Sequence, residues 1–157
     1  MLAHNLSAIT FVKRSFIPVL NLLMMLRKAI EFGLYPWFPA YGYAYIHPAN
    51  RRDFEALSPH GKVFEKISED EKWALVQYAE KQYKVDPDLF TPVAPLPFSF
   101  GDKVETIDRR PGQLRDWGVI YNIFWNTAED QAYFQLRQGK KDLAQLFRAG
   151  ELRMMEN

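Results

Sequence analysis

Short stretches of strand-forming residues, separated by turns, dominate the chain from residue 61 onward and constrain its fold more than any other feature. In residues 132–137, Ala-Tyr-Phe-Gln-Leu-Arg, apolar residues alternate with mostly polar ones at the two-residue period of a half-buried strand. Turns such as Gln138-Gly139 connect such stretches as hairpins. The strands that we expect are residues 62–67, 73–78, 82–85, 102–107, 118–125 and 132–137, with a weaker one at 143–148. The pattern predicts a mostly β fold.

A short helix precedes these strands. Phe54 and Leu57 lie three residues apart, on one face of a helix over residues 51–57, and the turn-forming residues 58–61 end it. Residues 43–46, Tyr-Ala-Tyr-Ile, form a further strand candidate. We therefore expect an α+β chain in which residues 32–92 form a small N-terminal α/β unit.

A proline-rich link separates this unit from the rest of the chain. Three prolines, Pro92, Pro95 and Pro97, occur within six residues and favour an extended, stiff connector. We expect a second unit at residues 98–157. The two units share a similar order of short strands, which fits either a duplication or a chance likeness between strands of similar composition.

The first residues, 1–31, form a separate segment with three open interpretations. An apolar run of 11 residues, 16–26, follows Lys13-Arg14, whereas a membrane helix needs about 20 apolar residues. Pro18 and Asn21 interrupt the run, and no small-x-small cleavage site of a signal peptide follows it. We expect no membrane span, and we interpret the segment as a docked helix, a non-native extension, or a segment for export or membrane contact.

The composition narrows the classes of function. The chain of 157 residues is 48% hydrophobic, which is ample material for a core and argues against wholesale disorder. It contains no cysteine, which excludes disulfides, thiolate metal sites and cysteine nucleophiles and fits a cytoplasmic location. The net charge is +1, with acids and bases nearly balanced beyond residue 31, so binding of nucleic acid mainly through phosphates is disfavoured.

The second unit carries a resemblance to a known architecture. The order Phe100-Gly-Asp-Lys-Val104, loop, Trp117-Gly-Val-Ile120, turn, Ala132-Tyr-Phe134, turn, Glu151-Leu152 is similar to SH3-like β-barrels of the KOW and Tudor kind. The chain also resembles short bacterial proteins of unknown function that carry such a barrel. This resemblance implies a five-stranded SH3-like barrel, a fold that hosts many unrelated functions. The core residues expected for it are Val104, Val119, Ile123, Phe134, Leu136, Phe147 and Leu152.

No constellation of residues predicts chemistry, so we expect no enzyme, no cofactor and no metal site. His47 and His60 lie thirteen residues apart, without the i, i+4 spacing of a helical zinc pair. None of the serines lies in a Gly-x-Ser-x-Gly turn, and no glycine-rich phosphate loop is present.

Two groups of residues are candidates for binding a partner. The first is an aromatic stretch broken by prolines, which either forms a partner surface or seals the gap between the two units. The second flanks Pro111-Gly112 in a long loop and either rims a ligand groove or is solvated and paired with nearby acids. The first group comprises Tyr35, Trp37, Phe38 and Tyr41, and the second comprises Arg109, Arg110, Arg115 and Trp117.

Three functions follow from these candidates. The leading hypothesis is a non-catalytic module that binds another protein, one concrete form being an immunity-type protein that occupies the surface of a toxin. The alternative is an adaptor for nucleic acid or a ribonucleoprotein, which would act through the loop from Arg109 to Trp117. The third is a small metal-dependent hydrolase near His47.

Overall fold

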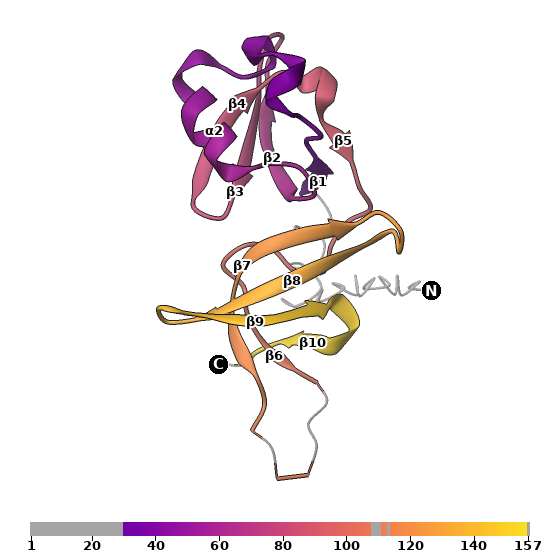
Figure 1. Cartoon of the computed structure of the whole chain (residues 1–157). Coiled ribbons are helices and arrows are strands. Elements are labelled where there is room, and N and C mark those ends of the chain that lie inside the picture. The colour runs from indigo at the N-terminus through magenta and orange to yellow at the C-terminus, as the bar shows by residue number, and fades with distance from the viewer. Residues whose placement is uncertain (1–29, 108–110, 113, 157) are drawn as a thin grey trace, which may run out of the picture.

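The described part of the chain folds into two antiparallel five-stranded sheets and one short helix. The computed structural model describes residues 30–107, 111–112 and 114–156. The interpretations of residues 1–29 therefore lie outside the described residues, as do Arg109 and Arg110. The first sheet and the helix lie above the second sheet in Figure 1.

The first sheet has the strand order β4-β3-β2-β1-β5, with every neighbouring pair antiparallel. Within the strand at residues 81–85, Tyr83 and Val85 are buried, whereas Lys81, Gln82 and Lys84 are exposed. The strands are β1 (Glu31–Leu34), β2 (Val63–Glu69), β3 (Ala74–Tyr78), β4 (Lys81–Val85) and β5 (Thr91–Pro92).

The connection from β1 to β2 contains the predicted helix, α2 (Arg51–Leu57). Phe54 is its buried residue, and the helix ends where Ser58 takes a left-handed conformation with φ of 53°. Three 3₁₀ turns precede it, at Pro39–Tyr41, Tyr43–Tyr45 and Pro48–Asn50. The helix prediction is confirmed, whereas the strand predicted at 43–46 is wrong, because only Ile46 pairs with a strand residue, Val85.

The second sheet has the order β10-β6-β7-β8-β9 and is also antiparallel. The longest strand, β7, lies in its centre, and the weak strand predicted near residue 143 is present as β9. A bulge in β7 between Ile120 and Asn122 shifts its register against β8. The strands are β6 (Lys103–Thr106), β7 (Trp117–Asn126), β8 (Gln131–Gln138), β9 (Lys141–Arg148) and β10 (Leu152–Met154).

Two parts of the predicted fold class are wrong. The second unit is not a closed SH3-like barrel: within the described residues, β9 and β10 are the two edges of an open sheet. Closing a barrel requires the end strands to pair, but β10 has three residues and its one partner is β6. The first unit is not an α/β unit either, because its helix connects two antiparallel strands, β1 and β2.

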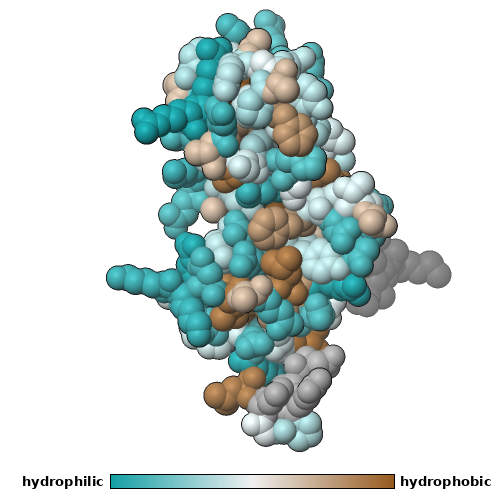
Figure 2. All heavy atoms as spheres, viewed as in Figure 1, coloured by the Kyte–Doolittle hydropathy of each residue, from teal (hydrophilic) through white to brown (hydrophobic). Residues whose placement is uncertain are grey.

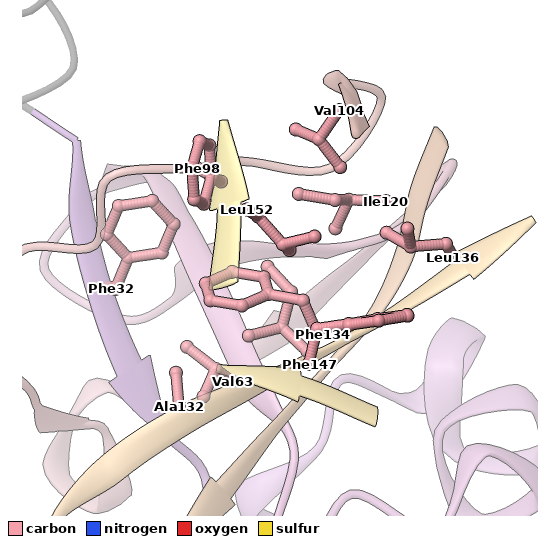
Figure 3. Packing of buried hydrophobic residues seen from close by; sticks show 11 residues of the cluster. Phe32, Val63, Phe98, Val104, Ile120, Ala132, Phe134, Leu136, Phe147 and Leu152 are labelled. Carbon is pink, nitrogen blue, oxygen red and sulfur yellow. The ribbon is translucent and has the colours of Figure 1, made fainter. Parts of the chain in front are cut away.

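Two clusters of buried residues form the core. One lies between the first sheet and α2 and includes Trp37, Phe54 and Val76. The other lies on the second sheet. The second cluster also contains Phe32 from β1 and Val63 from β2, which Figure 3 shows beside residues of the second sheet. The two sheets therefore share part of one core.

The predicted core of the second unit is confirmed except at one position. Val119 is 37% exposed. The other six predicted residues are buried: Val104, Ile123, Phe134, Leu136, Phe147 and Leu152.

Further contacts join the two sheets. The Trp125 amide donates to the Gly61 carbonyl (2.9 Å), and Lys62 forms a bridge with Phe124. The Tyr78 hydroxyl on β3 donates to Asn122 Oδ1 on β7 (2.9 Å). Among the described residues, no helix has the length and apolar character needed to cross a membrane.

Candidate functional site

Two of the four predicted aromatic partner residues are part of the core. Tyr35 and Trp37 are each 1% exposed, so their side chains are not available to a partner. The Tyr35 hydroxyl donates to the carbonyls of Asp86 (2.9 Å) and Tyr45 (3.2 Å), and burial raises the pKa of this hydroxyl. The Trp37 indole donates to the Gly42 carbonyl (2.9 Å). These two side chains anchor the loop after β1 on the first sheet.

The other two aromatic residues face solvent. Phe38 is 43% exposed and Tyr41 is 58% exposed, and their ring centroids lie 5.9 Å apart. The ring of His60, from the turn after α2, lies 4.6 Å from that of Phe38. Together, Phe38, Tyr41 and His60 form a surface that we call the aromatic patch. On the face shown in Figure 2, most of the surface is hydrophilic and apolar residues gather near its middle.

The backbone under the aromatic patch is held in a tight turn. The Tyr41 amide donates to the Phe38 carbonyl (2.9 Å), and the Gly42 amide donates to the Pro39 carbonyl (3.0 Å). Gly42 has φ of 92°, a conformation that residues with a side chain rarely adopt. Arg51 Nε donates to the Tyr43 and Ile46 carbonyls, both at 3.1 Å, which ties the loop to α2. The patch is therefore presented on an ordered loop.

Of the second group of candidate partner residues, the structure describes Arg115 and Trp117, which lie just before β7 and at its start. Arg115 Nη1 pairs with Glu105 Oε1 (3.4 Å), and Arg153 Nη2 pairs with the same oxygen (2.9 Å). Trp117 is 40% exposed at the start of β7, with Lys103 Nζ 5.2 Å from its ring centroid. The structure thus gives Arg115 an acidic partner and leaves Trp117 on the surface.

The two histidines have separate surroundings. His47 Nδ1 accepts a hydrogen bond from the Ala49 amide (3.1 Å), and its ring contacts Trp73. His60 contacts Phe38 in the aromatic patch. Within the part of the chain that the structure describes, no group of three or more His, Cys, Asp or Glu side chains is arranged to hold a metal ion.

An open cleft of about 900 Å³ lies between the two units. Residues of α2 and of the β3–β4 turn form one wall, including Asp53 and Glu80. Residues of β7 and β8 form the other wall, including Tyr121 and Arg137. Burial is the main cause that raises the pKa of the Tyr121 hydroxyl, and a hydrogen bond to Asp142 adds to it.

Residues 24–153 match the model of a family of unknown function, DUF6960. The chain belongs to this family. Comparisons with curated proteins and with solved structures gave no match. The family match spans both sheets of the structure.

Sequence reasoning missed the cleft of this DUF6960 chain entirely. Its walls come from segments more than 30 residues apart, such as Asp53 on α2 and Arg137 on β8. The sequence holds one signal of the cleft: Trp117, Val119 and Tyr121 are spaced by two residues, the period that places side chains on one face of a strand. The bulge after Ile120 conceals which of these side chains point outward.

Proposed function

We propose that this DUF6960 chain is a non-catalytic module that binds another protein through the aromatic patch. The observation that carries the proposal is the contrast within one loop: Tyr35 and Trp37 are buried, while Phe38 and Tyr41 point into solvent. Large aromatic side chains dominate the affinity of protein interfaces. Within residues 35–41, two aromatic side chains anchor the loop and two are presented to solvent.

The ordered loop favours binding energetically. Burying a large apolar side chain contributes roughly 1.5–3 kcal/mol, and ordering a flexible loop on binding would offset part of this gain. Here the 3₁₀ turn at Pro39–Tyr41 and the bonds from Arg51 already fix the backbone. The patch offers contact area from three rings, Phe38, Tyr41 and His60, which suits a protein surface.

The proposal is tested with the double variant F38A/Y41A. The full chain is immobilised, the protein that it captures is identified, and the purified partner is titrated against wild type and variant by calorimetry. Because interface hot spots cost more than about 1.4 kcal/mol each when truncated, we expect the double variant to bind at least about tenfold more weakly. L146A, a change of a 43% exposed residue on the second sheet, should leave the affinity unchanged.

Two results would overturn the proposal. One is a partner that binds F38A/Y41A as tightly as wild type. The other is equal weakening in L146A and F38A/Y41A, which would point to general damage rather than a contact surface. Near-ultraviolet circular dichroism of both variants checks that the fold is retained.

A further inference from the structure

The second sheet carries an exposed face in which aromatic and cationic side chains surround one valine. Val119 is 37% exposed near the start of β7, and its neighbours in the sheet are Lys103 on β6 and Arg137 on β8. Along β7, Trp117 lies two residues before it and Tyr121 two residues after it. We call these five residues the outer face.

A cation lies near each ring of the outer face. Lys103 Nζ is 5.2 Å from the ring centroid of Trp117, and the Arg137 guanidinium is 4.1 Å from that of Tyr121. Gln138 Nε2 donates to the Trp117 carbonyl (2.7 Å), which holds the start of β7 against β8. With about 3.3 Å per residue of regular strand, Trp117 and Tyr121 are at most roughly 13 Å apart along β7, which is bulged at Tyr121. The sheet therefore presents two separated aromatic platforms, Trp117 exposed and Tyr121 partly exposed, each next to a positive charge.

Around this face, four cations outnumber three carboxylates, an excess of one that equals the net charge of +1 of the whole chain. The carboxylates are Glu105 and Asp142, together with Glu80, which adds a negative charge near Arg137 from across the cleft. Asp142 pairs with Arg137 and thereby fixes the guanidinium beside Tyr121. Lys103 forms none of the ion pairs found among the described residues. The four cations are Lys103, Arg115, Arg137 and Arg153.

We propose that the outer face binds single-stranded nucleic acid, with bases stacked on Trp117 and Tyr121 and a phosphate beside Lys103. Base stacking on aromatic side chains next to basic groups is the general mode of single-strand binding. A duplex keeps its base faces stacked inside, so it cannot use the two platforms. The cleft of about 900 Å³ begins beside Tyr121 and gives the strand room to continue. This site is independent of the aromatic patch.

The modest excess of charge makes stacking the main source of affinity. Each phosphate neutralised by a protein cation contributes about −0.7 to the slope of log K against log salt for a single strand. One or two such contacts predict a slope of about −0.7 to −1.4, far shallower than that of a protein that binds mainly through phosphates.

The test is fluorescence anisotropy of a labelled strand of eight thymidines, titrated with the full chain at several salt concentrations. Because stacking contributes about 1–3 kcal/mol per base, we expect W117A and Y121A each to weaken binding by about 5-fold to 150-fold. W117F keeps a ring and should bind within about threefold of wild type. L146A and F38A/Y41A should bind as wild type does, and an eight-base-pair duplex should bind more weakly.

Several outcomes would overturn the proposal. Absence of binding by the wild-type chain at up to 100 µM protein would do so, as would equal binding of the duplex. Retained affinity in W117A and Y121A, with loss in K103A alone, would show a purely electrostatic contact and contradict the stacking mode. Loss of affinity in L146A to the same degree as in W117A would also contradict the stacking mode. Because F38A/Y41A leaves this site intact, failure here is distinguishable from failure of the protein-binding proposal.

Discussion

At the residue scale, Glu65 is a carboxylic acid buried in the described core. It is 8% exposed on β2, between β1 and β3, and its carboxylate accepts a hydrogen bond from the Phe100 amide (3.3 Å). Burial raises the pKa of Glu65 above its ordinary value of 4.5, and the negative charge of Asp102 acts in the same direction. The ionised form therefore destabilises the folded state relative to the unfolded chain.

We expect E65Q to be more stable than wild type at neutral pH. Since the pKa is higher in the folded state, ionisation of Glu65 lowers stability as the pH rises from the unfolded pKa through the folded pKa. Glutamine keeps an oxygen for the Phe100 amide and has no charge to bury. The melting temperature of E65Q should exceed that of wild type at pH 7, and the difference should shrink as the pH falls to about 4.

The matched control is E71Q, which changes an exposed glutamate in the turn between β2 and β3 and should show no such trend. A stability difference between E65Q and wild type that is the same at pH 4 and pH 8 would contradict the role of ionisation.

At the scale of elements, the contact between β3 and β7 rests on one hydroxyl. Tyr78 is 3% exposed; its hydroxyl donates to Asn122 Oδ1 (2.9 Å) and accepts from the Ile123 amide (3.3 Å). Asn122 Nδ2 in turn donates to Gln135 Oε1 (3.0 Å) on β8. These hydrogen bonds lie next to the bulge in β7, where the Tyr78 hydroxyl is the partner of the Ile123 backbone amide.

The variant Y78F should weaken the joint between the sheets. It removes the Tyr78 hydroxyl and leaves the Ile123 backbone amide and Asn122 Oδ1 without this partner. Such a loss costs about 1–3 kcal/mol of stability. We expect the midpoint of urea unfolding to fall accordingly. Y41F, which removes the hydroxyl of an exposed tyrosine, should leave the midpoint unchanged within error. Equal midpoints for Y78F and wild type would show that the hydrogen bonds do not hold the sheets together.

The bulge in β7 also explains why the predicted core was partly wrong. Val119 and Ile123 are four residues apart, so strict alternation places both on one face, and the sequence predicted both as core. The extra residue between Ile120 and Asn122 reverses the phase, so Ile120 and Ile123 are buried and Val119 is exposed. A bulge depends on pairing with β8 and leaves no clear mark in the sequence of β7 alone.

Other features were predictable only in part. The helix at 51–57 and most strands follow from local period and turn residues, which act within a few positions. Residues 43–46 have strand-forming side chains, yet the bonds from Arg51 and Tyr35 draw this backbone into a 3₁₀ turn. The open edges of the second sheet and the cleft walls depend on contacts between distant segments. Of the candidate aromatic residues, composition alone could not separate buried Trp37 from exposed Tyr41.

At the scale of the whole molecule, the two sheets are coupled through shared packing. Phe32 and Val63 belong to the first sheet by hydrogen bonding, yet their side chains lie in the cluster of the second sheet, as Figure 3 shows. The segment after the prolines adds to this, because Phe98 lies in that cluster and Phe100 packs against both. This arrangement favours a single cooperative unit over two sheets that unfold independently.

The variant V63A tests this coupling directly. Removing two buried methyl groups costs about 1–2 kcal/mol through lost apolar burial and a small cavity. If the sheets unfold together, native-state hydrogen exchange should show the same loss of protection at Val76 in the first sheet and at Phe134 in the second. V93A changes a partly buried residue at the margin of the same cluster and should give a smaller, parallel loss. Faster exchange confined to Phe134 and its neighbours would show two separate folding units, because the side chain of Val63 contributes to the core of the second sheet while its backbone belongs to the first.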